Sequence, residues 1–329
     1  MLLTDFCGNE TAKKSLAYYI ESKQFPHAFL IEGESGLGKA TFAKLIYASM
    51  VCAGKDKPCG ACSSCRKIMG DIHPDFIVLK GKGTPNSFHI DLIRALKKEL
   101  YLVPNDSEKK LYLIKDADTM TIQAQNAMLK ILEEPPEFAV FVLTCKNKSL
   151  LLETILSRTT HIKLAPVSKK DQKEYLCRRF PHVPPEKIEE AVVLSGGNIK
   201  ESINFLNGEE GHTALIAVDR ITSALISKNE YDLLAALSPL CKDKELCSLV
   251  FAMLIATFRD TIALKYSKKE ALIIPSRKNS SELSKKLSSG ALLSMITAVE
   301  NAKIKLNKNV NQNLLITALC GELSSAVPV

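Results

Sequence analysis

Four cysteines lie close together in the segment 52–65. Cys52, Cys59, Cys62 and Cys65 follow the spacing C-x6-C-x2-C-x2-C. Four thiolates can surround Zn²⁺ tetrahedrally, and each C-x2-C step places two sulfurs on a tight turn around one ion. Because four protein ligands leave no open coordination position, the spacing predicts a structural zinc site. Unconnected core cysteines are the alternative, which the polar residues between them disfavour.

A second segment, 33–40, has the composition of a phosphate-binding loop, with the sequence Gly-Glu-Ser-Gly-Leu-Gly-Lys-Ala. It follows an apolar run and precedes a helix-period stretch, which is the context that such a loop requires. Glycines let the backbone turn sharply and direct its N–H groups inward, while the lysine reaches the outer phosphates. The residues that would contact phosphate are Gly33, Gly36, Gly38 and Lys39.

The positions that would hold Mg²⁺ are altered. A hydrolysing loop normally ends in Ser or Thr, whose hydroxyl binds the metal, whereas this loop ends in Ala40. Thr41 follows, but one helical step turns a side chain by about 100°. In a hydrolysing enzyme the strand expected over 111–114 would end in an acidic pair; here Lys115 and Asp116 follow it. We therefore predict a degenerate loop without intrinsic ATPase activity, and the sequence leaves nucleotide binding itself open.

Arg158 lies between Ser157 and Thr159, after a helix-like stretch and before an apolar run. An arginine in this position is either a solvated surface charge or an arginine finger that reaches the γ-phosphate bound by a neighbouring subunit. The residues alone leave both interpretations open.

The elements that must position these residues follow from hydrophobic periodicity. Short apolar runs alternate with helix-period segments up to about residue 164, which predicts an α/β domain with a parallel sheet. The expected strands are 28–32, 76–79, 111–114, 140–144 and 161–164, and the helices between them include 40–50, 90–100 and 122–133.

Beyond Pro166, helix-period stretches dominate and an exposed loop is expected over 267–286. The expected helices are 169–180, 185–194, 199–206, 213–225, 231–237, 244–265, 281–287, 291–306 and 313–324. We predict three domains: an α/β domain over 1–165 that carries the zinc insert 52–65, a small helical lid domain over 166–211, and a helical collar domain over 212–329.

The composition narrows the class of protein. The chain has 329 residues and a formal charge of +8, and its hydrophobic fraction of 46% is that of a globular protein. No uninterrupted apolar run reaches about 18 residues, and the N-terminus has no secretory-signal pattern, so we expect a cytoplasmic protein without a membrane partner. Six of the 10 cysteines are scattered and are expected to be ordinary buried residues. The positive charge permits a nucleic-acid partner without requiring one.

Several motifs occur in a fixed order after the phosphate loop and the cysteine cluster. They are His73-Pro74-Asp75, Lys115-Asp116-Ala117-Asp118, Asn126-Ala127-Met128-Leu129-Lys130, Leu132-Glu133-Glu134-Pro135-Pro136 and Ser157-Arg158-Thr159. In this order they resemble the clamp-loader subunits of bacterial DNA polymerase III, members of the AAA+ group. The resemblance is specific up to about residue 205 and only architectural beyond it.

Two branches of that family differ at the nucleotide site. The tau/gamma branch is the ATPase motor and keeps both Mg²⁺-binding positions, whereas the delta-prime branch shares the fold and zinc module but commonly has a degraded site. With Ala40, Lys115 and Asp116, this sequence is similar to the delta-prime branch. A tau/gamma-like motor is the alternative. A zinc-dependent nucleic-acid reader is a third hypothesis, disfavoured because the insert has few aromatic residues for base stacking.

The resemblance implies a role for the whole chain. The family forms a five-subunit ring, with tau/gamma and delta subunits, that opens a sliding clamp and closes it on primer–template DNA. It implies a non-catalytic stator whose Arg158 acts in trans on ATP held by an adjacent motor subunit. Thr159 replaces the usual Cys, which leaves the arginine available. Lys200 stands where the motor has Arg in the sensor-2 region, and Lys lacks the planar fork of Arg.

Overall fold

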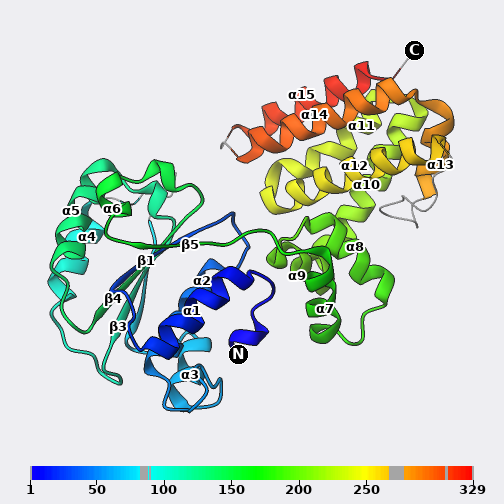
Figure 1. Ribbon diagram of the computed structural model, residues 1–329. Helices are drawn as coiled ribbons and strands as arrows, with labels where there is room; N and C mark the ends of the chain where they lie inside the picture. Colours follow the sequence, from blue (N-terminus) through cyan, green and yellow to red (C-terminus); the bar gives the residue numbers. More distant parts are fainter. Residues whose placement is uncertain (1, 82–87, 89, 267–277, 308–309, 328–329) are drawn as a thin grey trace. The chain divides into compact units, whose positions relative to one another are not determined.

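The structure is a computed structural model that describes residues 2–81, 88, 90–266, 278–307 and 310–327 (Figure 1). The chain divides into two compact units. The first consists of Met1–Gln172 with Gly197–Lys200, and the second of Lys173–Gly196 with Glu201–Val329.

A five-stranded parallel sheet forms the centre of the first unit, in the order β2-β3-β4-β1-β5 (Figure 1). The strands are β1 (Ala28–Glu32), β2 (Phe76–Leu79), β3 (Lys110–Ile114), β4 (Ala139–Cys145) and β5 (Thr160–Lys163). Each lies where the sequence predicted it, to within one residue at either end. The register pairs Leu30 of β1 with Leu143 of β4 and with His161 of β5.

Helices cover both faces of this sheet, because successive residues of a strand point to opposite faces. Phe29 and Ile31 pack on the face covered by α1 (Glu10–Ser22), α2 (Lys39–Val51) and α3 (Ser63–Met69). Leu30 and Tyr112 pack on the face covered by the other three helices. These are α4 (Ile90–Glu99), α5 (Ile122–Glu133) and α6 (Glu153–Leu156). Burial on both faces explains why the central strands β1, β3 and β4 are nearly continuous apolar runs, whereas the edge strands β2 and β5 keep exposed residues.

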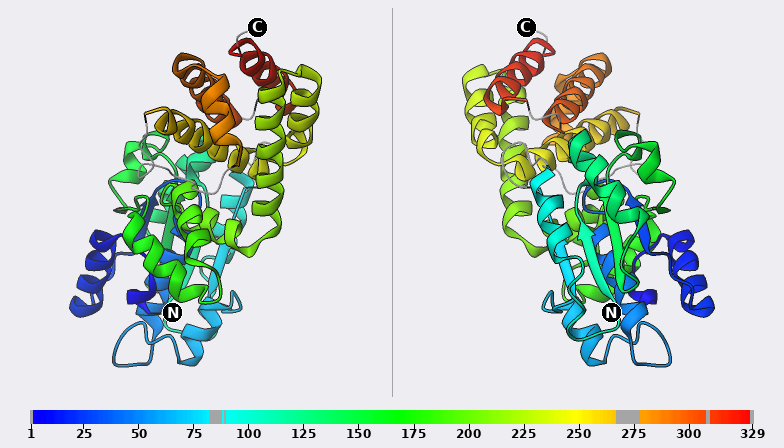
Figure 2. Two further views of the ribbon diagram at one scale, coloured as in Figure 1. Left: turned by 90° about the vertical axis from the view of Figure 1, so that its right-hand side faces the viewer. Right: turned by 90° about the vertical axis from the view of Figure 1, so that its left-hand side faces the viewer.

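The second unit is helical throughout its described part (Figure 2). The remaining helices of the chain are α7 (Lys169–Arg179), α8 (Pro185–Ser195), α9 (Ile199–Asn207), α10 (Glu209–Ser227), α11 (Glu230–Leu237), α12 (Lys244–Lys265), α13 (Lys278–Lys286), α14 (Ser289–Asn307) and α15 (Gln312–Ser325). One apolar cluster extends from Leu176 to Leu323 and includes buried residues of both the predicted lid and the predicted collar. The division into these two domains stays a prediction.

Part of the expected loop over 267–286 is helical. Residues 278–286 form α13, whose Leu283 is buried in the apolar cluster, so the helix predicted over 281–287 is confirmed to within three residues and the overlapping loop prediction was wrong for this part. Residues 267–277 of that expected loop lie outside the described residues.

Among the described helices, α12 alone is long and apolar enough to cross a membrane by length and composition. Its apolar character has another cause. Val250, Phe251, Leu254 and Phe258 have no exposed surface within the helical unit, where α12 packs against α10, α13 and α14. The composition of α12 is therefore that of a core helix.

Candidate functional site

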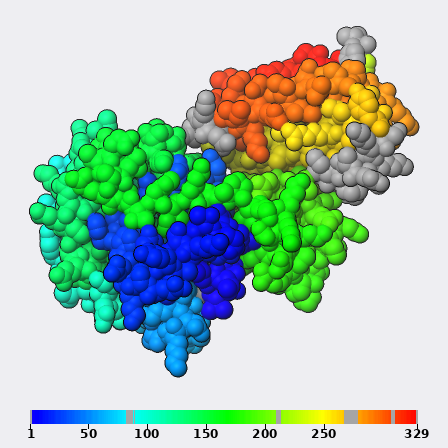
Figure 3. Space-filling view, in the orientation of Figure 1, coloured from blue at the N-terminus to red at the C-terminus, as the bar shows by residue number. Residues whose placement is uncertain are grey.

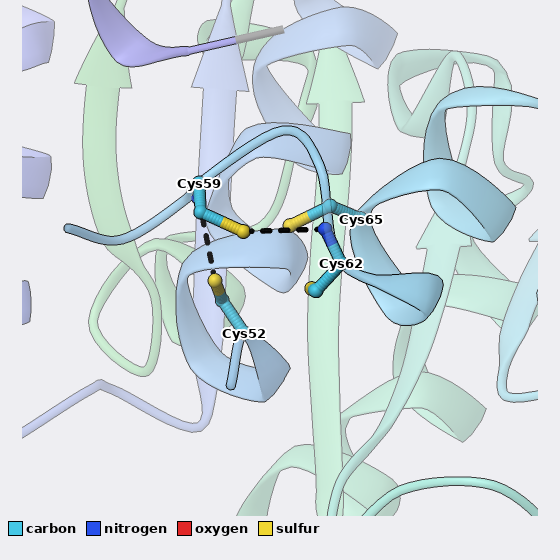
Figure 4. Close-up of side chains that lie close together, drawn as sticks. All are labelled: Cys52, Cys59, Cys62 and Cys65. Atoms are coloured by element: carbon cyan, nitrogen blue, oxygen red, sulfur yellow. Dashed lines mark hydrogen bonds between the residues drawn. The ribbon is translucent and has the colours of Figure 1, made fainter. Parts of the chain in front are cut away.

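The four cysteines of the insert converge in space. The segment that carries them, light blue in Figures 1 and 3, forms a projection at the lower edge of the first unit. Their sulfur atoms all lie within 4.8 Å of one another (Figure 4). Cys52 directly follows α2 and Cys62 directly precedes α3, so two helix ends and the turn between them bring the thiols together.

This donor set fits a closed tetrahedral site. Zn–S bonds of about 2.3 Å would place the sulfurs about 3.8 Å apart, so a small contraction of the cluster is sufficient. Backbone N–H groups already point at the sulfurs: Gly54 and Cys59 donate to Cys52 Sγ, each at 3.3 Å, and Cys62 donates to Cys59 Sγ at 3.3 Å. The close turn requires glycine, because a Cβ on Gly54 would lie 2.7 Å from the Cβ of Cys59.

The thiols differ in acidity. Backbone N–H groups of Ala61 and Cys62, together with the thiol of Cys52, lower the pKa of Cys59 to about 6. Burial raises the pKa of Cys65 to about 12, so a cation that binds this set must displace protons. The four residues could hold a metal ion, and the preference of four thiolates is for a soft divalent ion such as Zn²⁺.

The insert is tied to the sheet through the loop 105–107. Lys67 of α3 forms an ion pair with Asp106 at 2.5 Å. The carboxylate of Asp75, which is fully buried, accepts hydrogen bonds from the backbone N–H groups of Asn105 (2.7 Å), Asp106 (2.8 Å) and Ser107 (3.1 Å). Burial alone would raise the pKa of Asp75, but these donors lower it below its ordinary value. Within the motif His73-Pro74-Asp75, the aspartate therefore has a structural role.

The phosphate-loop segment lies between β1 and α2, as the sequence predicted. Gly36 and Gly38 have φ angles of 85° and 88°, which glycine adopts at little cost. Gly33 donates its N–H to Cys145 O at 3.1 Å, and a Cβ at this position would lie 2.7 Å from Leu164 O. The loop therefore packs directly against the ends of β4 and β5.

Lys39 contacts its own loop. Its ammonium donates to Glu34 O at 3.0 Å and also to Gly33 O. Burial lowers the pKa of Lys39, and the carboxylates of Asp116 and Asp118 oppose part of this effect. The acidic residues that follow β3 are thus electrostatic partners of the loop lysine.

The positions expected to bind Mg²⁺ carry the residues that the sequence analysis identified. Ala40 is the second residue of α2 and has no hydroxyl, while Thr41 after it is partly exposed. Lys115 follows the last residue of β3 and donates its backbone N–H to Leu79 O at 2.9 Å. Asp116 adopts a left-handed backbone conformation, with φ of 55°.

A segment far along the chain contacts the phosphate loop. The side-chain amide of Asn198 donates to Ser35 O at 2.9 Å, and the backbone N–H of Lys200 donates to Gly36 O at 3.3 Å. The fit is close, since a Cβ on Gly36 would lie 2.2 Å from Asn198 Oδ1. The sequence indicated Lys200 but not Asn198, whose only sequence signal is its place after two glycines and directly before α9.

Arg158 follows α6 and its guanidinium is held by its own chain. Nη2 forms an ion pair with Glu133 Oε1 at 2.8 Å, and Nη1 donates to Thr154 O at 3.0 Å and to Ser157 Oγ at 3.3 Å. The side chain is 36% exposed. The sequence predicted that the arginine would be accessible, but it did not indicate Glu133 as its partner.

Gln125 of α5 fixes the segment that leads to Arg158. Its buried side-chain oxygen accepts a hydrogen bond from Leu152 N at 2.8 Å, and its amide nitrogen donates to Leu150 O at 3.2 Å. The turn at α6 is therefore attached to α5, whose last residue is Glu133.

The fold defines the class: an α/β domain with a parallel sheet and a phosphate-loop segment after β1, followed by a helical C-terminal part, as the sequence predicted. Comparisons with known proteins give the family. Residues 8–168 match a family model described as DNA polymerase III, delta subunit, and residues 219–323 match the model of its C-terminal part.

Individual relatives agree with these matches. The DNA polymerase III subunit delta' of Bacillus subtilis is 29% identical over 307 residues, which span 91% of each chain. The corresponding subunit of Pseudomonas aeruginosa is 32% identical, over 53% of this chain and 54% of its own. Subunit tau of Bacillus subtilis is 29% identical over 65% of this chain but only 34% of its own. Among solved structures, a gamma-subunit-related protein from Thermotoga maritima aligns with 95% of this chain and 99% of its own, at 18% identity and a TM-score of 0.49.

The chain belongs to the family of DNA polymerase III delta and delta-prime clamp-loader subunits. Within that family it resembles the delta-prime branch, because the Bacillus subtilis delta' subunit matches it over nearly the full length of both chains.

Proposed function

We propose that this chain is a non-hydrolysing, delta-prime-type subunit of a cytoplasmic clamp loader. Together with tau/gamma and delta subunits in a five-membered ring, it helps to load a sliding clamp onto primer–template DNA. The observation that carries the non-motor role is the combination of Ala40 at the end of the phosphate loop with Lys115 after β3.

The physical reason lies in what Mg²⁺ requires. The ion takes oxygen ligands in near-octahedral geometry and is usually held by a hydroxyl or carboxylate together with substrate phosphates. The methyl group of Ala40 supplies no ligand, and the ammonium of Lys115 repels a cation. A nucleotide bound at this loop would therefore lack the metal that neutralises charge during hydrolysis. In this proposal the loop is structural, and Gly33, Gly36, Gly38, Lys39 and Thr41 form at most a degenerate nucleotide site.

The active contribution of the chain is Arg158. Its guanidinium is partly exposed and contacts Glu133 of α5 and Thr154 of α6, so it is available to a neighbouring subunit. A guanidinium supplied in trans stabilises the charge that develops on a transferred phosphoryl group. ATP hydrolysis by an adjacent motor subunit would then depend on contact with this chain.

Zinc is the proposed structural cofactor of the insert. Cys52, Cys59, Cys62 and Cys65 would hold it, and the metal would supply the cross-link between the ends of α2 and α3. In this role the ion fixes the projection that the insert forms and takes no part in chemistry.

The test is ATP turnover by the purified chain, before and after it is mixed with its own tau/gamma and delta subunits. We expect no Mg²⁺-dependent turnover by the chain alone and full turnover by the complex. Arg158→Ala should leave the complex assembled but lower its turnover. Arg178→Ala should leave the turnover unchanged, because within the described part of the chain Arg178 pairs only with Glu174 of its own helix, at an exposed position. Turnover by the isolated chain at the rate of a motor subunit would favour the tau/gamma-like alternative instead.

A further inference from the structure

We propose that Glu133 is a positioning residue for Arg158, holding the guanidinium in the direction from which it reaches a phosphate on a neighbouring subunit. This inference rests on the proposed trans action of Arg158. It assigns a role to a carboxylate that touches neither nucleotide nor metal.

The hydrogen-bond geometry of the guanidinium carries the first step. An arginine has five N–H donors in a rigid planar fork. Both N–H groups of Nη1 have acceptors, Thr154 O and Ser157 Oγ, and Nη2 forms an ion pair with Glu133 Oε1 at 2.8 Å. Nε and Nη2 donate no hydrogen bond to another described residue. The edge of the guanidinium that carries Nε and Nη2 therefore stays available for a phosphate, which binds such an edge in a bidentate manner.

The second step is the rigidity of the carboxylate. Glu133 ends α5, directly after Ile131 and Leu132, which are 2% and 1% exposed. The carboxylate therefore extends from a helix end that is anchored in the core. Without it, Nη1 alone would restrain the guanidinium, and only through one carbonyl and one rotatable hydroxyl. The long, partly exposed side chain of Arg158 would then sample other rotamers.

The third step is the difference in contacts between Glu133 and the neighbouring Glu134. A carboxylate at the C-terminal end of a helix is disfavoured by the helix dipole, and α5 ends with Glu133 followed by Glu134. Only Glu133 is paired with Arg158, whereas Glu134 is exposed and forms no ion pair in the described part of the chain. Glu134 therefore provides a matched control, with the same charge one residue away.

The experiment uses the reconstituted loader and three variants of this chain: Glu133→Ala, Glu133→Gln and Glu134→Ala. An exposed ion pair shifts a conformational population by up to about fivefold, so Glu133→Ala should lower kcat about threefold to fivefold. The KM for ATP should not change, because the motor subunit binds the nucleotide. Glu133→Gln should fall between this variant and the wild type, since its amide oxygen keeps only a partial negative charge beside Nη2. Glu134→Ala should match the wild type.

A double variant distinguishes positioning from general destabilisation. If Glu133 acts only through Arg158, adding Glu133→Ala to Arg158→Ala should cause no further loss. An equal further loss in that background, or an unchanged or increased kcat for Glu133→Ala alone, would overturn the proposal. If Arg158→Ala itself leaves turnover unchanged, the trans role of the arginine fails first, so the two failures are distinguishable.

Discussion

Asp75 gives the sharpest test of how the insert is attached to the sheet. Its fully buried carboxylate organises the loop 105–107. The substitution Asp75→Asn keeps the shape of the side chain but replaces one acceptor oxygen by an NH₂ donor. We expect it to destabilise the first unit selectively.

The magnitude follows from the two oxygens. Oδ2 accepts from Asp106 N at 2.8 Å and from the N–H and hydroxyl of Ser107, each at 3.1 Å, whereas Oδ1 accepts from Asn105 at 2.7 and 3.3 Å. The amide oxygen of the variant should take the Oδ2 position, because Oδ2 accepts three hydrogen bonds and Oδ1 accepts two. Its NH₂ group then faces the backbone N–H of Asn105, which loses its acceptor. One buried donor without an acceptor costs about 1–3 kcal/mol, and the remaining bonds lose their charge assistance, so we expect about 2–4 kcal/mol in total.

Urea unfolding measures the loss in the free energy of unfolding. Hydrogen exchange then shows in which of the two units the loss occurs, because it reports the stability of each unit separately. Asp71→Asn is the control: this aspartate is exposed, pairs with Lys44 at 2.7 Å, and has a φ of 59° that Asn tolerates. It should cost less than about 0.5 kcal/mol. If Asp75→Asn costs no more than the control, the anchoring role is refuted.

The pH dependence of this difference has a defined sign. Because the folded pKa of Asp75 is lowered, its contribution is fully present above the ordinary pKa of an aspartate, about 3.9. It is lost as the pH falls through the lower folded pKa. The stability gap between wild type and Asp75→Asn should therefore be constant near neutral pH and narrow only in that acidic range. A gap that narrows between pH 5 and 8 would contradict the assignment.

Three further predictions concern other parts of the chain. Elemental analysis should find about one zinc ion per chain; chelation or Cys59→Ser should remove it and destabilise the first unit. Cys177→Ser should do neither, because this thiol is exposed and not buried as its scattered position in the sequence predicted. Asn198→Ala removes a hydrogen bond to Ser35 and should cost about 1 kcal/mol, detected as faster hydrogen exchange in the phosphate loop. Phe251→Ala, at a fully buried position of α12, should cost about 3–5 kcal/mol; calorimetry should show a lowered transition for the helical unit with that of the first unit unchanged.

The strands could be predicted closely from the sequence because of their burial. The central strands β1, β3 and β4 are covered by helices on both faces, so each forms a compact apolar run between polar turns, whereas in the edge strand β5 only Ile162 is buried. The helices α1 and α3 were missed. α3 has only 7 residues, which is too short for a clear helical period. Strand order and register depend on contacts between distant segments, which periodicity does not encode.

In the candidate site, too, local features could be predicted from the sequence and contacts between distant segments could not. The cysteine cluster and the glycine loop are local in sequence, and spacing was sufficient to identify them. The partners that fix functional side chains are remote. Asn198 is 163 residues from Ser35, which it contacts, and Glu133 ends α5 whereas Arg158 lies in the turn after α6. Glu133 was visible in the sequence only as a member of a motif without an assigned contact, and Asn198 only by its place after two glycines.

The phosphate loop contains motif residues that are kept and one motif position, Ala40, that is changed. The kept residues differ from Ala40 in their contacts within the chain. Every motif residue that is present has a structural reason within this chain: Gly33 lies against Leu164 O, Gly36 and Gly38 have positive φ angles, and Lys39 binds two carbonyls of its own loop. The position that lost its motif residue, Ala40, has metal binding as its main task in a motor subunit. Packing therefore accounts for the loop sequence without any bound nucleotide. The glycine-rich motif alone predicts the fold of β1 and α2, and the metal positions beside it decide whether hydrolysis can occur.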